Sequence, residues 1–275
     1  CEASLSVDRF QTFAPLPIMT FSQLRLPPWR ISYADPARLP LGESKTLRFD
    51  DFSFTDGDFA FNLYEGELTI AFPENGEAFG VQLAPTDALL PLQGVVFRNF
   101  SYTGVVEPFR EPYLSFPQSL SGESIIIGEE SLVSNVALSF HLLDMNKVVV
   151  DSLALTFDGS AYELNPAKIT IEQFENGSVS IDLNTSIFSI PDLLVRVEGI
   201  SGGIALSTID PLSTSGFQEL RFDSIYYGDR DEVLVSDVAL SFHLLDPSKV
   251  FVDSLAFTFD GSAYELNPAK ITIEQ

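Results

Sequence analysis

The sequence predicts an all-β protein, a tandem array of antiparallel β-sandwich modules of about 100 residues each. Three observations lead to this prediction. Residues 131–173 return 102 positions later as residues 233–275, with only six differences among 43 aligned positions. Short alternating apolar runs are separated by Asp-Gly and Asn-Gly pairs. No stretch sustains the 3.6-residue apolar period of a helix.

The hairpin signals lie inside each copy of the repeat. Residues 153–164 alternate in polarity on both sides of Asp158-Gly159, and residues 169–183 do so around Asn176-Gly177. The two central residues of a type I′ turn both need positive φ, which Asn, Asp and Gly tolerate best. We therefore expect two hairpins in each copy that contains both pairs.

An older and more divergent copy precedes the two similar ones. Residues 47–76 align with residues 148–177 at a shift of 101, and the apolar positions keep their phase. Asp50 falls on Asp151 in this alignment. Residues 124–128 resemble residues 224–228, so the later part of the module repeats as well.

The repeat gives a domain plan in which the first and last modules are incomplete. Residues 1–38 are expected to be the tail of a module or a donor strand, residues 39–130 module 1, residues 131–232 module 2, and residues 233–275 the first part of module 3. A continuous β-solenoid is the alternative. We favour separate modules because solenoid coils usually give a shorter inner period than the one seen here.

The third copy lacks a strand that the first two contain. In those copies an Asn-Gly turn leads into residues 79–83 and 179–183, whereas the printed chain reaches Gln275 before this turn. An unpaired strand edge can be completed by a strand from a neighbouring chain. The residues that we expect to pair between subunits are Ile271, Ile273 and Gln275 at this edge and Leu5, Val7 and Phe10 in the N-terminal segment.

Charge and cysteine content limit the classes of partner. The net charge is −24, with 39 acidic and 15 basic residues. Nucleic acid is therefore not an expected partner, because phosphate binding needs a basic surface. No apolar run reaches the length of a transmembrane segment. Cys1 is the only cysteine, so a disulfide within the chain is excluded.

Cys1 also has a second interpretation. Bacterial lipoproteins carry their acyl chains on an N-terminal cysteine after signal-peptide removal, so Cys1 is a candidate lipidation site. The alternative is that the printed chain happens to begin at this residue. The expected location is extracellular or at the cell surface, because a strongly acidic surface is common on proteins outside cells.

Motifs for catalysis or cofactor binding are not found in the sequence. His141 and His243 occupy the same repeat position on an expected strand, where a surface histidine is the simplest interpretation. We therefore expect neither enzymatic activity nor a cofactor. The acidic pair Asp56-Gly-Asp58 leaves a structural Ca²⁺ as an alternative. Tyr226 and Tyr227 could stack on a sugar ring, although Trp29 is the single tryptophan.

Two segments of the second copy resemble a known class of proteins. Residues 155–164, Leu-Thr-Phe-Asp-Gly-Ser-Ala-Tyr-Glu-Leu, and residues 169–177, Ile-Thr-Ile-Glu-Gln-Phe-Glu-Asn-Gly, resemble hairpins of secreted β-rich surface proteins of the cyanobacterial PEP-CTERM type. The resemblance implies export and a role at the cell surface or in a matrix. The short sorting tail of that class, with its Pro-Glu-Pro motif, is not among the printed residues.

The sequence supports two hypotheses for function. The first is an extracellular structural protein that assembles head to tail, by inter-subunit strand completion, into a filament or surface layer. Its partner is then another copy of the same chain. The second is an adhesin-like or carbohydrate-binding stalk on the cell surface, with a glycan as ligand.

Overall fold

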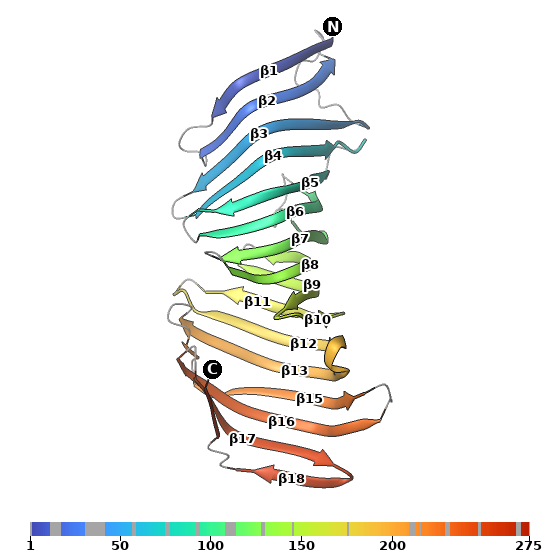
Figure 1. Ribbon diagram of the computed structural model, residues 1–275, viewed down its shortest axis with the longest axis vertical. Coiled ribbons are helices and arrows are strands. Elements are labelled where there is room, and N and C mark those ends of the chain that lie inside the picture. Colours follow the sequence, from blue (N-terminus) through green and yellow to red (C-terminus); the bar gives the residue numbers. More distant parts are fainter. Residues whose placement is uncertain are drawn as a thin grey trace. The chain divides into compact units, whose positions relative to one another are not determined.

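The computed structural model of the chain confirms the all-β class (Figure 1). It describes residues 2–11, 18–30, 42–56, 59–74, 78–91, 94–107, 114–127, 130–144, 146–174, 176–208, 213–214, 216–228, 232–246, 249–267 and 271–274. Within these residues every element is a β-strand except the short 3-10 turn η1 (Pro191–Leu193). The chain divides into two compact units, Cys1–Ala137 and Leu138–Gln275.

The first unit is an antiparallel meander, in which each strand pairs with the next one along the chain. Its strands are β1 (Glu2–Gln11), β2 (Ile18–Arg30), β3 (Ser44–Asp56), β4 (Phe59–Ala71), β5 (Phe79–Leu90), β6 (Val95–Val106) and β7 (Gln118–Ile127). The following strand, β8 (Glu130–Asp144), includes the boundary between the two units.

The second unit repeats this plan, with two strand positions divided into shorter pieces. Its strands are β9 (Lys147–Phe157), β10 (Ser160–Leu164), β11 (Ile169–Gln173), β12 (Val179–Ile190), β13 (Val195–Thr208), β14 (Ser213–Thr214), β15 (Gln218–Tyr227), β16 (Val233–Asp246), β17 (Lys249–Phe259), β18 (Ser262–Leu266) and β19 (Ile271–Glu274). β10 and β11 both pair with β9 and β12, and together they take the place that β4 has in the first unit. β18 and β19 pair with β17 in the same way.

The expected sandwich modules are not confirmed. Within each unit the described strands pair consecutively in one antiparallel sheet, with no division into two hydrogen-bonded sheets. Alternating runs and tight turns specify strands and their neighbours, but both arrangements have these features. The expected module bounds after residues 38, 130 and 232 stay predictions.

The expected Asp-Gly hairpin is confirmed in both copies. Asp158 and Gly159 have φ values of 47° and 78°, and Asp260 and Gly261 have φ values of 46° and 70°. Both pairs therefore have positive φ at the two central positions, as a type I′ turn requires. The turns join β9 to β10 and β17 to β18.

Every second strand position contains a residue with positive φ near its middle. In the first unit these residues are Gln23, Glu65, Asn99 and Asn135, and in the second they are Lys168, Gly199 and Asp237. A left-handed residue inside a strand interrupts the ladder of backbone pairs and bends the strand. The strands thus acquire two arms on either side of a bend.

Apolar side chains from both arms form the core of the first unit. The buried residues Phe49, Leu63, Leu83 and Ala88 belong to one cluster. One cross-strand row of this cluster, on one side of the bend, is Leu47, Leu68, Leu83 and Tyr102. The row on the other side is Phe52, Leu63, Ala88 and Phe97. A bent sheet can therefore bury apolar side chains of its own two arms against each other.

A buried threonine hydroxyl stabilises the bend in each unit. Thr86 is 5 % exposed and donates a hydrogen bond to the carbonyl of Tyr64, which precedes the left-handed residue Glu65. Thr185 is 2 % exposed and donates to the carbonyl of Ala167, which precedes the left-handed residue Lys168. A buried carbonyl without a donor would carry a desolvation penalty. In both copies a buried threonine therefore satisfies the carbonyl that precedes the left-handed residue of the bend.

Replacing this hydroxyl by a methyl group should destabilise the fold. We expect Thr185→Val to lower the free energy of unfolding by about 1–3 kcal/mol, because the carbonyl of Ala167 loses its donor. Urea unfolding followed by circular dichroism measures the change. Thr103→Val is the matched control, because Thr103 is an exposed strand residue. Equal effects of the two substitutions would contradict a special role for the buried hydroxyl.

Candidate functional site

The residues expected to pair between subunits lie on edge strands. β19 pairs with β17, with Ile271 opposite Val252 and Ile273 opposite Val250. β1 pairs with β2, and the register places Leu5, Val7 and Phe10 opposite Leu26, Leu24 and Phe21. Among the described residues neither β1 nor β19 has a second partner strand. Gln275 and Cys1 lie outside the described residues.

The second copy shows how this edge is covered when the following strand is present. Ile169 of β11 pairs with Val150 of β9 on one side and with Leu183 of β12 on the other. Likewise, Leu164 of β10 pairs with Phe188 of β12. In the third copy β19 pairs with β17 in the register that β11 has with β9. No counterpart of β12 lies among the described residues. β12 therefore defines the kind of strand that fits beside β18 and β19.

A five-residue sequence that occurs twice measures the effect of a neighbouring strand such as β12. Ser-Ala-Tyr-Glu-Leu forms both β10 and β18. Tyr162 and Leu164 are half-buried in β10, whereas Tyr264 and Leu266 in β18 are each 48 % exposed. Tyr162 stacks on Phe188 of β12, with ring centroids 6.2 Å apart. Because the two sequences are identical, their surroundings account for the difference in exposure. β12 lies beside β10, and Phe257 replaces Leu155 opposite the tyrosine in the third copy.

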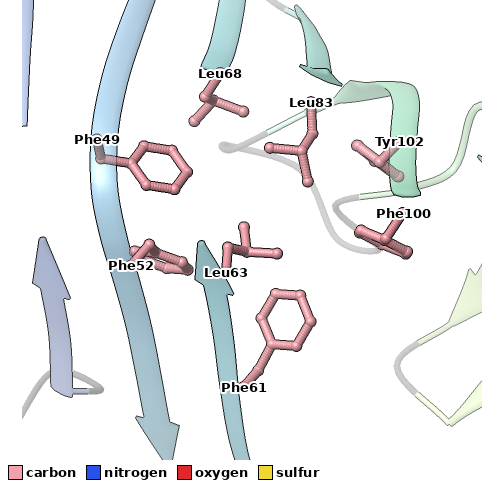
Figure 2. Close-up of a pocket in the computed structure, with 8 residues that line it drawn as sticks. All are labelled: Phe49, Phe52, Phe61, Leu63, Leu68, Leu83, Phe100 and Tyr102. Carbon is pink, nitrogen blue, oxygen red and sulfur yellow. The ribbon is translucent and has the colours of Figure 1, made fainter. Parts of the chain in front are cut away.

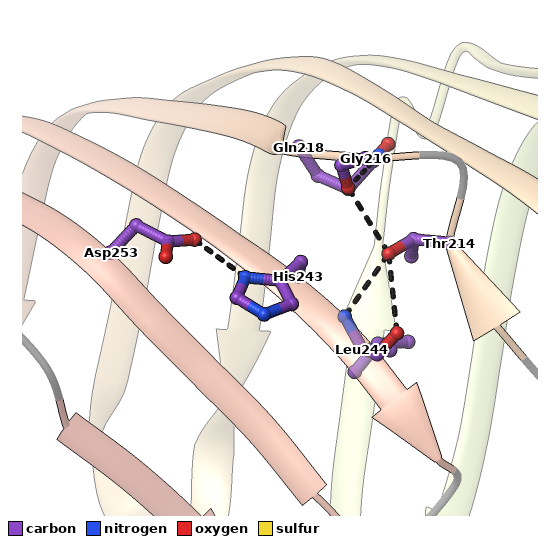
Figure 3. Close-up of polar contacts among 6 residues, drawn as sticks. All are labelled: Thr214, Gly216, Gln218, His243, Leu244 and Asp253. Atoms are coloured by element: carbon purple, nitrogen blue, oxygen red, sulfur yellow. Dashed lines mark hydrogen bonds and ion pairs between the residues drawn. The ribbon is translucent and has the colours of Figure 1, made fainter.

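The two histidines form the same contact in both later copies. His141 Nδ1 lies 2.9 Å from Asp151 Oδ2, and His243 Nδ1 lies 2.8 Å from Asp253 Oδ2 (Figure 3). In the first copy the aligned acid, Asp50, lies 4.0 Å from Arg25. An arginine at this place has no role as a general base. The repeated contact is thus a cross-strand pair between a cation or imidazole and a carboxylate.

A buried glutamine occupies one position in both units. Gln118 is fully buried, and its amide nitrogen donates to the carbonyls of Val105 at 2.9 Å and Phe116 at 2.5 Å. Gln218 is 4 % exposed, donates to the carbonyl of Gly216 at 2.9 Å (Figure 3), and accepts from the backbone N–H of Ala205 at 2.6 Å. Both side chains tie the start of a strand to the strand with which it pairs, β7 to β6 and β15 to β13.

Sequence reasoning missed these glutamines and the buried threonines. Both pairs lie in the part of the repeat where identity is low, and polar residues on strands are usually exposed. The available signal was a polar residue of the same type at the same repeat position. Gln118 and Gln218 stand 100 residues apart, close to the repeat period.

The first unit contains an apolar cavity of about 270 Å³ that is partly open to solvent, lined by side chains on both sides of the bends (Figure 2). We name it the aromatic cavity. It is lined by Phe49, Phe52, Phe61, Leu63, Leu68, Leu83, Phe100 and Tyr102. The hydroxyl of Tyr102 donates to Oε1 of Gln118. Burial raises the pKa of Tyr102, because the phenolate would lose solvation.

The remaining candidate residues do not come together in one site. Among the described residues no group of three or more histidine, cysteine and acidic side chains has a geometry that would hold a metal ion. Asp58, of the acidic pair considered for Ca²⁺, lies outside the described residues. Arg196 lies over the ring of Tyr226 at 4.3 Å, so one face of that ring is covered. Tyr227 is 64 % exposed.

No protein-family model, curated protein or solved structure matches the chain. Among the described residues no helix has the length and apolar character needed to cross a membrane. The interpretation of function therefore depends on the geometry of this chain alone.

The raised pKa of Tyr102 predicts a loss of stability at alkaline pH. The unfolded tyrosine ionises near pH 10, whereas folded Tyr102 resists ionisation. Its contribution to stability is present below that pH and is lost as the pH rises through the raised folded-state pKa. We expect Tyr102→Phe to reduce the fall in stability between about pH 9 and pH 11.

The measurement is urea unfolding at a series of pH values. Tyr227→Phe is the matched control, because this side chain is exposed. An unchanged pH dependence in Tyr102→Phe would show that the Tyr102 hydroxyl ionises as freely in the folded chain as in the unfolded one.

Proposed function

We propose that the chain is an extracellular structural protein, the subunit of a filament or surface layer that grows by adding strands at the β18–β19 edge. The observation that carries this proposal is the repeated Ser-Ala-Tyr-Glu-Leu sequence. It is half-buried beside β12 in the second copy and exposed in the third. β19 pairs with β17 in the same register in which β11 pairs with β9. The other edge of β11 accepts β12.

The donor strand in this proposal is β1 of another copy. β1 pairs with β2 on one side, and its second edge has no partner among the described residues. Leu5 and Val7 alternate with polar residues in β1, as Ile181 and Leu183 do in β12. Addition of β1 to β18 and β19 would join the first part of one copy to the last part of the next. Such a head-to-tail contact does not close, so it generates a filament.

The size of the contact indicates weak, reversible addition. β12 makes five register pairs with β11 and two with β10. At about 0.5–1.5 kcal/mol net for each hydrogen bond, a strand of this length contributes roughly 4–10 kcal/mol. Association itself costs about 4–15 kcal/mol. The backbone pairs alone are thus marginal, and burial of Tyr264 and Leu266 supplies the remaining stabilisation.

The cell-surface stalk remains a second proposal, with glycan binding as its activity. The exposure of Tyr227 favours it, because an accessible aromatic ring can stack on a sugar. The counterpart of Tyr227 in the first unit is Ile127, so this ring is not repeated. Binding to a glycan array, lost in Tyr227→Ala, would support the stalk over the filament. Neither proposal assigns a catalytic residue or a cofactor to the chain.

Electron microscopy with intact mass measurement on the same native sample tests the filament. Ordered filaments built from a 30.3 kDa species support strand addition between subunits. A discrete monomer of that mass contradicts it. A much heavier chain carrying the same repeat would mean that the missing strand comes from the same polypeptide, and would also contradict it.

A charge at the exposed edge should prevent assembly. We expect Tyr264→Glu to raise the protein concentration needed for assembly at least tenfold, because the carboxylate would be buried against the incoming strand. Sedimentation of polymer at a series of protein concentrations measures this change. Tyr227→Glu is the matched control, because Tyr227 is exposed but lies on β15, away from the edge strands. Equal inhibition by both variants would contradict the edge model.

A peptide with the sequence of residues 176–194 should cap the growing end. It contains β12, which fits the equivalent edge in the second copy. We expect this peptide to slow filament growth, measured by light scattering, in a concentration-dependent manner. The same peptide with Leu183→Glu and Phe188→Glu is the control, because these side chains oppose Ile169 and Leu164. Growth that is unaffected by the parent peptide would place the contact elsewhere.

A further inference from the structure

The aromatic cavity lies where the two arms of the bent strands face each other. Phe49, Leu68, Leu83 and Tyr102 surround one part of it, and Phe52, Leu63, Phe61 and Phe100 surround the other (Figure 2). Phe49 opposes Gly66 across the ladder, and a Cβ atom on Gly66 would overlap the Phe49 ring. The glycine therefore leaves room for the far end of this ring over the backbone at the edge of the cavity.

The walls of the cavity offer no free hydrogen-bond donor to orient a polar ligand. The lining side chains are hydrocarbon except for the hydroxyl of Tyr102. The proton of that hydroxyl is already donated to Gln118, whose amide nitrogen donates in turn to two backbone carbonyls. A charged or strongly hydrogen-bonding ligand would lose its solvation without compensation in such a site.

Four of the five aromatic residues that line the cavity are specific to the first copy of the repeat, and only Phe61 aligns with a tyrosine in the later copies. The positions of Phe49 and Phe52 are occupied by valine and leucine in both later copies, at Val150 and Leu153 and again at Val252 and Leu255. The counterparts of Phe100 and Tyr102 in the second unit are Ile200 and Gly202. The bent sheet is thus built in the second unit without these rings, so the fold itself does not require them.

We propose that the aromatic cavity is a binding site for a small, uncharged, apolar molecule of about ten carbon atoms. A cavity of about 150 Å³ lined by Leu, Ile and Phe is large enough to bind benzene. The cavity here, at about 270 Å³, has room for two fused rings or a short alkyl chain. Edge-to-face contacts such as that between Phe61 and Phe100, with centroids 6.2 Å apart, show that its rings can pack against further rings.

Naphthalene is a suitable probe, since it has two fused rings and no polar atom. Titration of the full chain is followed by naphthalene fluorescence and by NMR of leucine methyl groups. We expect saturable binding and shifts confined to the methyl groups of Leu63, Leu68 and Leu83. Leu68→Phe reduces the free volume and should weaken binding at least tenfold. Ile169→Phe, at the aligned position of the second copy, should leave binding unchanged.

A second variant tests whether Leu68→Phe loses binding only because it fails to fold. Phe52→Leu combined with Phe100→Ile introduces residues that the later copies carry at these positions, so a folded chain is expected. Loss of ring contacts should weaken naphthalene binding several-fold in this variant. Absence of saturable binding to the parent chain would overturn the proposal. Undiminished binding to a folded Leu68→Phe, or methyl shifts elsewhere, would overturn it as well.

Discussion

Every second strand position must hold a left-handed residue near its middle without leaving buried backbone groups unsatisfied, and the rest of the structure depends on this constraint. The bend needs positive φ, which costs little for glycine and more for other residues. Asn99 occupies a bend in the first unit, and its side chain donates to Glu123. Gly199 occupies the aligned bend in the second unit, where a Cβ atom would overlap the carboxylate of Asp223. The two copies therefore place the same acidic position against two different bend residues.

The bend also explains how a meander acquires a core. A flat sheet exposes one face unless another layer covers it. In the first unit the row that contains Leu68 and Leu83 lies across the bend from the row that contains Leu63 and Ala88, and the two rows belong to one apolar cluster. The hydroxyl of Thr86 lies between these rows in the sequence of β5 and satisfies a carbonyl at the bend. Burial of apolar surface and satisfaction of the backbone thus occur at the same place.

Local features could be predicted from the sequence, and the assembly of the sheet could not. The strands and the turn at Asp158-Gly159 follow from alternation and from the φ preferences of two residues. The bends at Glu65 and Lys168 do not, because these residue types have no preference for positive φ. The sandwich was expected because its sequence pattern does not differ from that of a bent meander. The cavity depends on side chains from four strands, and no local pattern in the sequence brings them together.

Comparison of the three copies of the repeat distinguishes the residues that the fold requires from those that it tolerates. The second and third copies differ at only six of 43 aligned positions, and these positions leave the Ser-Ala-Tyr-Glu-Leu strand unchanged. Its exposure in the third copy is therefore a property of the neighbouring strands and not of its own sequence. The first copy keeps the apolar phase of the same segment but replaces aliphatic residues by aromatic ones around a cavity. A strand edge that repeats unchanged suits a contact between copies, whereas side chains that occur in a single copy suit a ligand bound once per chain.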